Sequence, residues 1–159
     1  MMREKDLELQ NRNYDTALTS AAAAGNIETA KTMLEKNPKL NEIPNKNGVM
    51  PIYMAALFAK PKMVTYLYDI SNKMAGDFWT HQNRGWVVQK CVDADMFGVA
   101  LKILNDRPQL ILQNGTIGDI LLSMAQKPHA FEQKKTNIIL AKIKSSKYML
   151  ITPISLLVL

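Results

Sequence analysis

The chain is poor in the residues that metal sites and disulfide scaffolds need. It has one cysteine, Cys91, and two histidines, His81 and His129, among 159 residues. A single cysteine excludes an internal disulfide and is typical of a reducing compartment. A structural zinc site needs four ligands and a catalytic one three, of the right type and spacing. We therefore expect no metal site and no cofactor, and we expect Cys91 to be a small core residue.

Catalytic motifs are also missing from the sequence. There is no glycine-rich phosphate loop and no Gly-x-Ser-x-Gly elbow. Asp93 and Asp95 form a close acidic pair. We expect this pair to cap the helix that follows it rather than to act as a catalytic dyad. The sequence therefore predicts a protein that is not an enzyme and has no catalytic residue.

Long apolar runs are scarce. The most apolar stretch is the final one, which starts at Tyr148 and is interrupted by Pro153. A membrane span needs about 20 consecutive apolar residues, so we expect no transmembrane segment. Residues 1–10 are polar and charged and do not resemble a secretory signal. These features predict a cytoplasmic location.

Charge is divided unevenly along the chain. Residues 1–132 hold 15 Lys and Arg against 14 Asp and Glu, whereas residues 133–159 hold five lysines and no acid. A nucleic-acid-binding domain carries its basic face on the folded body, so we do not expect nucleic acid as a partner. We divide the chain into a domain at 1–132 and a basic, apolar tail at 133–159. The tail is a cap on the domain, a contact with the cytoplasmic face of a membrane, or the result of truncation.

What the sequence does contain is a repeat. Segments that start at Thr16, Met50, Trp86 and Ile120 align with one another, so the period is about 34 residues. A fixed period in this range indicates a stacked solenoid. One column holds large apolar residues that we expect to be buried: Leu18, Ile52, Val88 and Leu122.

The spacing of apolar residues within the repeat predicts two short helices in each copy. Apolar residues in the first copy recur at the helical spacing on both sides of Gly25, which suits a tight turn. Pro38 and Pro108 stand where the second helix should end. The stretch 71–85 is longer than a standard connection, and we expect a loop or finger there. In the fourth copy the apolar pattern is lost after residue 132.

The repeat resembles the ankyrin repeat. Residues 16–21 and 50–55 are similar to its Thr-Pro-Leu-His-x-Ala opening, and residues 21–26 resemble the bend between its two helices. More narrowly, the sequence resembles plant ankyrin proteins that carry a C-terminal PGG-type membrane domain, which this chain lacks. The resemblance implies an all-α ankyrin-repeat solenoid of about four degenerate repeats. It also implies a truncated signalling protein.

The resemblance further implies a binding surface. Ankyrin proteins bind protein partners on a concave surface made of hairpin tips and of outward positions on each first helix. Carried over to this chain, the hairpin residues are Arg12, Asn13, Tyr14, Lys46, Asn47 and Arg84, and the principal helix residues are Met54 and Phe58. Tyr14 stands in a turn column that holds Gly48 in the next copy, so we expect the first hairpin to be distorted or exposed. The implied function is non-catalytic protein–protein interaction.

Overall fold

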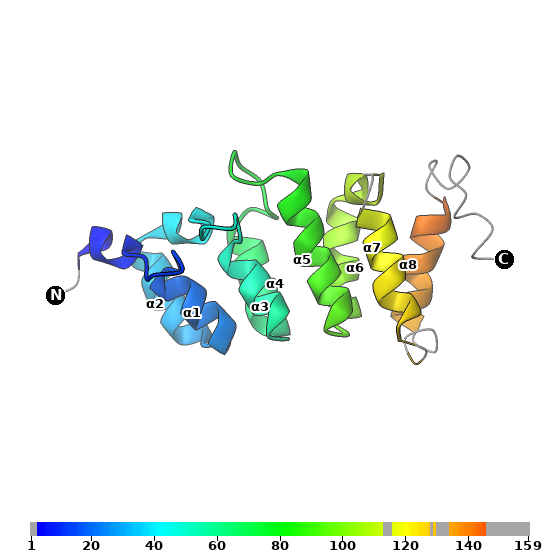
Figure 1. The fold of residues 1–159 in the computed structure, drawn as a ribbon, viewed down its shortest axis with the longest axis horizontal. Coiled ribbons are helices and arrows are strands. Elements are labelled where there is room, and N and C mark those ends of the chain that lie inside the picture. Colours follow the sequence, from blue (N-terminus) through cyan, green and yellow to red (C-terminus); the bar gives the residue numbers. More distant parts are fainter. Residues whose placement is uncertain (1–2, 113–115, 128, 130–133, 146–159) are drawn as a thin grey trace.

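The chain folds into a row of stacked helix pairs. The computed structural model describes residues 3–112, 116–127, 129 and 134–145, and every regular element in these ranges is a helix. The pairs follow one another along a single axis, from the pair at residues 17–36 at one end of the row to the helix at residues 134–145 at the other (Figure 1). The expected all-α solenoid of about four repeats is confirmed.

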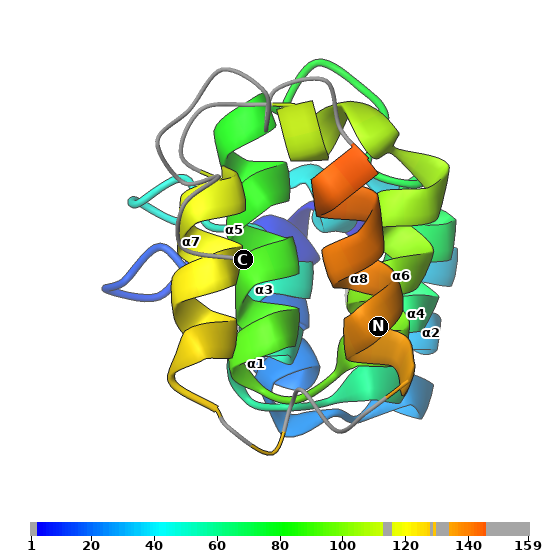
Figure 2. The same cartoon turned by 90° about the vertical axis from the view of Figure 1, so that its right-hand side faces the viewer.

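The helices form two layers. The first helices of the pairs, which we call the inner helices, are α1 (Ala17–Ala24), α3 (Pro51–Leu57), α5 (His81–Asp93) and α7 (Thr116–Ala125). The outer helices are α2 (Ile27–Lys36), α4 (Pro61–Ile70), α6 (Phe97–Asp106) and α8 (Lys134–Ser145). Each helix contacts the next helix of its own layer. A view along the row shows the two layers side by side (Figure 2).

The core runs between the two layers as a continuous apolar seam. Leu18, Ile52 and Val88 are fully buried, as their column predicts. Outer helices contribute equivalent side chains, such as Leu67 and Leu104, to the same cluster. Burying one such side chain contributes roughly 1.5–3 kcal/mol. Each pair therefore depends on its neighbours to cover its apolar face.

The bend inside each of the first three pairs has one geometry. The backbone N–H groups of Asn26, Lys60 and Met96 donate to carbonyls five residues earlier, at 3.0, 2.9 and 2.8 Å. This bond pattern requires a left-handed residue just before the donor. Gly25 supplies it in the first pair with φ of +76°, as its position predicts. Alanine and aspartate take this conformation in the second and third pairs.

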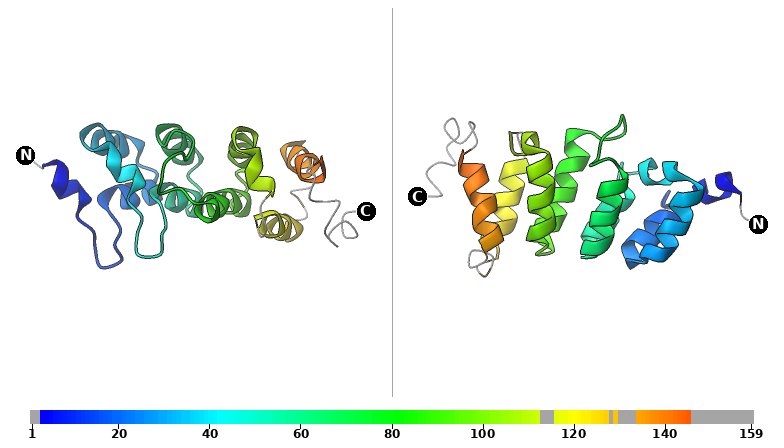
Figure 3. Two further views of the ribbon diagram at one scale, coloured as in Figure 1. Left: turned by 90° about the horizontal axis from the view of Figure 1, so that it is seen from above. Right: turned by 180° about the vertical axis from the view of Figure 1, so that it is seen from behind.

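Proline ends two outer helices, as expected. Helix α2 stops at Lys36 and α6 stops at Asp106, and a 3-10 helix starts at the proline that follows each one. These are η2 (Pro38–Glu42) and η3 (Pro108–Leu112), and η1 (Glu4–Glu8) lies one repeat before η2. The 3-10 helices lie along one edge of the row (Figure 3).

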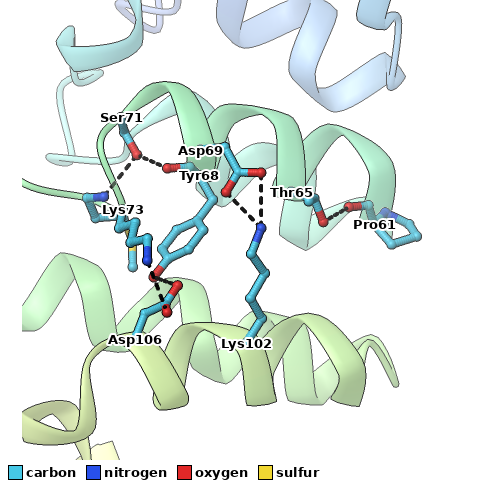
Figure 4. A network of polar contacts seen from close by, with 9 residues as sticks. Pro61, Thr65, Tyr68, Asp69, Ser71, Lys73, Lys102 and Asp106 are labelled. Carbon is cyan, nitrogen blue, oxygen red and sulfur yellow. Dashed lines mark hydrogen bonds and ion pairs between the residues drawn. The ribbon is translucent and has the colours of Figure 1, made fainter.

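Polar contacts join outer helices α4 and α6 at the surface (Figure 4). Lys102 donates to both carboxylate oxygens of Asp69, at 2.7 and 3.0 Å. The Tyr68 hydroxyl donates to Asp106 at 3.2 Å, and Lys73 pairs with the same carboxylate at 3.2 Å. Burial and the neighbouring Asp106 carboxylate raise the pKa of Tyr68, so this hydroxyl stays protonated as a donor. The contacts align the second repeat with the third.

The fourth repeat differs from its expected register. Leu122, which we expected in the core, is 60% exposed, whereas Ile120 and Met124 are fully buried. The backbone agrees, because the N–H of Lys127 donates to Met124 as that of Asp95 donates to Val92 in the preceding repeat. The third step of the repeat is therefore shorter, by two positions, than the alignment of the sequence predicts. The apolar run 120–122 allows both alignments.

Helix α8 continues the stack beyond residue 132, where the apolar pattern predicted its end. Its side chains Ile139 and Ile143 are buried in the common core, and α8 packs against α6. The prediction was wrong because α8 begins at Lys134, nine residues after the end of α7, whereas α2 begins three residues after the end of α1. The apolar residues of α8 therefore come later in the sequence than the repeat predicts. The remaining tail, residues 146–159, lies outside the described residues.

Candidate protein-binding surface

Two projecting turns begin the candidate surface. In the first, the N–H of Asn11 donates to the Asp15 carbonyl at 3.0 Å; in the second, Asn45 donates to Val49 at the same distance. Each asparagine also accepts two backbone N–H groups on its side-chain oxygen, at distances of 2.8 to 3.1 Å. This Asx arrangement closes a turn locally. The sequence thus forms two matching hairpin turns in successive repeats.

The first hairpin is exposed but not distorted. Tyr14 has a φ of +64° and takes the same left-handed conformation as Gly48, whose φ is +72°. The N–H groups of Tyr14 and Gly48 both donate to the asparagine three residues earlier, at 2.9 Å. Of the two expected alternatives, exposure is confirmed and distortion is not found, because the Asx bonds hold the turn even with an unfavourable residue. The Tyr14 ring is 55% exposed at the tip.

The two hairpins are tied to each other. Asn45 donates its side-chain amide to the Asp15 carboxylate at 3.2 Å, and Gln10 donates to the Pro44 carbonyl at 3.2 Å. The two turns therefore project on the same side of the row, as the view from above shows (Figure 3). Their exposed tips are Arg12, Asn13, Tyr14, Lys46 and Asn47.

A third hairpin does not form, so Arg84 is not at a hairpin tip. Thr80 caps α5 by accepting the N–H of Asn83 at 3.2 Å, and the helix begins at His81, before the expected turn. Arg84 therefore lies within α5 and donates to the Met74 carbonyl at 2.9 Å. The expected loop is confirmed only for residues 71–80. It winds through three consecutive left-handed residues, 72–74.

The outward columns of the inner helices complete the surface. Met54 is half-buried, and Phe58, at the end of α3, is 52% exposed. Ser20 and Lys90 occupy the same column as Met54 in the first and third repeats. With the corrected register, Leu122 falls in this column too. Sequence reasoning missed Leu122 as a surface residue, and the helical spacing of the buried side chains at 120, 123 and 124 is the signal that identifies it.

We call this surface the inner face. It consists of the two hairpin tips and the outward columns of α1, α3, α5 and α7. Four of the large apolar side chains that stand exposed in the described residues belong to it: Tyr14, Leu57, Phe58 and Leu122.

Ion pairs occupy the third repeat of the inner face. Lys90 pairs with Asp93 at 2.6 Å, and this hydrogen bond raises the pKa of the lysine. Burial alone would raise the pKa of Asp93, but hydrogen bonds from Lys90 and Ser123 lower it. Both groups are therefore charged at neutral pH. The pair makes this part of the face polar.

We expected Asp93 and Asp95 to cap the next helix, but they do not. Met96 is the N-cap of α6 and no side-chain bond closes that cap. Asp95 instead pairs with Lys127 at 2.7 Å, and this hydrogen bond lowers the pKa of the aspartate. Lys127 also donates to the carbonyls of Val92 and Asp93 at the end of α5. A cation at a helix C-terminus is favourable. Lys127 therefore joins the fourth repeat to the third through Asp95 and the end of α5.

Cys91 is buried between the layers, as its column predicts. Its side chain is fully covered, and burial raises the pKa of the thiol to about 12. In the part of the chain that the structure describes, no three histidine, cysteine, aspartate or glutamate side chains gather as a metal site would need. Among the described helices, none has the length and apolar character to cross a membrane.

The matched hairpins, the left-handed bends and the two helical layers agree with one family comparison. Residues 5–67 match the family model of ankyrin repeats. The fold is an ankyrin-repeat solenoid. The matched residues span the first repeat and most of the second, where both hairpins lie. No curated protein and no solved structure matches the chain. Ankyrin repeats are generally protein-interaction modules, and they are typically non-catalytic.

Proposed function

We propose that this chain is a non-catalytic adaptor or scaffold that binds a protein partner on its inner face. The observation that carries the proposal is the exposure of large apolar side chains there. Leu122 is 60% exposed although it lies in the middle of an amphipathic helix. Soluble domains rarely gather such side chains on one face unless another surface covers them.

The arrangement of the inner face suits recognition. Aromatic anchors and a few charged residues usually carry most of the energy of a protein interface. Tyr14 and Phe58 supply aromatic anchors in the first two repeats. Lys90 and Asp93 supply fixed charges in the third. Because hairpins and helices are held by the stack, little ordering is needed when a partner binds, which favours affinity.

The test compares two variants of the full chain as affinity baits. The double variant Phe58→Ala and Leu122→Ala removes two exposed side chains from the inner face. Ile70→Ala removes an exposed apolar side chain from the outer helix α4 and serves as the matched control. We expect proteins captured by the wild type to be lost with the double variant and retained with the control. Quantitative mass spectrometry measures the difference, and circular dichroism checks that all three chains are equally helical.

If the double variant and the control capture the same proteins in the same amounts, the inner face is not the binding surface. Binding assays with a captured partner then give the size of the effect. Truncating an interface anchor costs about 1–2 kcal/mol or more, which is a loss of roughly tenfold in affinity.

An alternative is that the chain is a short or truncated form of a membrane-linked ankyrin signalling protein. In that case residues 133–159 associate with a membrane surface at its cytoplasmic face, and the similarity to plant PGG-type proteins would apply. Helix α8 buries Ile139 and Ile143 against the stack, so these side chains are not free to enter a bilayer. Sedimentation of the full chain with phosphatidylserine vesicles but not with phosphatidylcholine vesicles would support the alternative. Equal or absent sedimentation would reject it.

A further inference from the structure

A hollow of about 390 Å³ lies on the edge of the row that carries the 3-10 helices. We call it the axial hollow. The residues that line it are Glu8 of η1, Lys39 and Glu42 of η2, Ile43, and Phe78 of the loop 71–80. None of these residues belongs to the inner face. The axial hollow is therefore a separate surface, and an inference drawn from it goes beyond the proposed function.

Two of its side chains stand in equivalent positions of successive repeats. Glu8 is the last residue of η1 and Glu42 the last residue of η2, and their spacing in the sequence equals that of Leu18 and Ile52. Equivalent positions of a solenoid are displaced by one repeat along its axis. The two carboxylates therefore line up parallel to the stack, and Phe78 of the irregular loop 71–80 lines the same hollow.

The Glu8 carboxylate and the backbone of the loop are held before any ligand arrives. The Glu8 carboxylate accepts a hydrogen bond of 2.7 Å from the side chain of Asn37, which is fully buried. The carboxylate of Glu42 lies against the loop, where a Cβ at Gly76 would come within 3.4 Å of its Oε1. Asn83 donates to the Phe78 carbonyl at 2.9 Å. The loop is thus fixed beside η2.

The chemistry of the lining favours a guanidinium group. Carboxylates accept paired N–H bonds from arginine, and the face of an aromatic ring attracts a cation. Phe78 is 56% exposed, so its ring is available for such a contact. Ile43 offers an apolar surface to the aliphatic stem of a long side chain. Lys39 is the opposing charge in the lining and limits the attraction.

We propose that the axial hollow binds arginine side chains of an extended partner peptide that runs parallel to the stack. Neighbouring helices that pack against each other along the row stand roughly 8–10 Å apart. A polyproline II segment rises about 3.1 Å per residue with three residues per turn, so every third side chain points the same way at about 9 Å. Arginines at positions i and i+3 of such a segment match Glu8 and Glu42.

The overall charge of +6 does not oppose this proposal. Five of the lysines lie in residues 133–159, whereas residues 1–132 are nearly neutral. The 3-10 helices η1 and η2 lie toward the opposite end of the row from α8 (Figure 1). Repulsion between exposed charges is screened beyond about 10 Å at moderate salt.

The experiment measures fluorescence anisotropy of a labelled, end-blocked peptide, Pro-Arg-Pro-Pro-Arg-Pro, with the full chain. A second peptide replaces both arginines by citrulline, which keeps the shape and removes the charge. A third places the two arginines next to each other. We expect the citrulline peptide to bind at least about tenfold more weakly than the arginine peptide, and the third peptide to lie between them.

Single variants test the lining. We expect Glu42→Gln and Phe78→Leu each to weaken binding of the arginine peptide about three- to tenfold, because one removes a charge and the other removes the ring face. Lys39→Gln should strengthen binding about two- to threefold, since it removes the opposing charge. Glu35→Gln, an exposed carboxylate on α2, is the matched control and should leave the affinity unchanged.

The proposal is overturned if the arginine peptide does not bind, or if the citrulline peptide binds as tightly. It is also overturned if Glu42→Gln and Phe78→Leu bind the arginine peptide as Glu35→Gln does. Circular dichroism of each variant identifies any loss of fold, and Lys39→Gln, whose expected effect is a gain, cannot be mimicked by unfolding.

Discussion

At the residue scale, several residues that carry a side chain adopt a left-handed backbone conformation that ordinarily favours glycine. Tyr14, Ala59 and Asp95 all have positive φ, where an L-residue with a Cβ is disfavoured. Such a conformation costs on the order of 1–2 kcal/mol. It persists because hydrogen bonds within each bend and turn hold it, such as those from Tyr14 to Asn11 and from Lys60 to Ala55. Degenerate repeats can therefore lose a glycine without losing the shape.

Tyr14→Gly should raise the free energy of unfolding by about 0.5–1 kcal/mol, because it relieves the left-handed strain at the hairpin. Gly48→Ala should lower it by about 1 kcal/mol, since nothing lies within 4 Å of the added Cβ and only the conformation is penalised. Urea denaturation measures both. Changes of the same sign in the two variants would contradict the equivalence of the hairpins.

Cys91 should be almost unreactive in the folded protein. Burial raises the pKa of its thiol to about 12, so at pH 8 only about one molecule in ten thousand carries a thiolate. A chromogenic disulfide reagent should react slowly in buffer and rapidly in concentrated urea. A native rate equal to that in urea would show that the thiol is open to solvent.

At the scale of single elements, two helices depart from their sequence pattern for different reasons. Helix α5 starts at His81 because Thr80 caps it, and nothing before Trp86 breaks the helix. This replaces the third hairpin by the loop 71–80. Helix α7 shifts its register, because its apolar run allows more than one buried face. The start of α5 is thus set by a local cap, whereas packing selects the buried face of α7.

The register of α7 can be tested by two alanine substitutions. Ile120→Ala should cost about 2–4 kcal/mol of stability, because the side chain is fully buried and leaves a cavity. Leu122→Ala should change stability by less than about 0.5 kcal/mol, since the side chain is mostly exposed. Thermal or urea unfolding distinguishes the two. The reverse order would return Leu122 to the buried column that the sequence alignment gave it.

At the scale of the whole molecule, stability depends on the contacts between adjacent repeats. Helices α1 and α2 make their principal contacts within the first two repeats and with the adjoining 3-10 helices, and α8 packs chiefly on α6. A solenoid of this kind can loosen at one end while the rest stays folded. The part of the proposed binding surface that lies on the first two repeats is thus separated from events at α8.

Ile143→Ala should increase hydrogen exchange in α8 and α6 and leave α1 and α2 protected as in the wild type. The reason is that Ile143 is buried in the core and that α8 packs chiefly on α6. Exchange detected by mass spectrometry resolves the segments, and Ile138→Ala, on the exposed side of α8, is the control. A uniform increase along the chain would show that the molecule unfolds as one unit.

Sequence alone determined the repeat and most of its core. The period placed Leu18, Ile52 and Val88 in one buried column, and Gly25 and Pro38 marked a bend and a helix end, because these signals act over a few residues. The resemblance to ankyrin repeats predicted the hairpin tips Arg12, Asn13, Lys46 and Asn47, and both turns are closed by local asparagine bonds.

Only the tertiary structure decided which face each ambiguous helix buries. It turned Leu122 outward and brought α8 into the stack. It also gathered Glu8, Glu42 and Phe78 around one hollow. These outcomes depend on contacts between residues far apart in the chain. Burial of an apolar face stabilises the fold only when the neighbouring repeat is in place to cover that face.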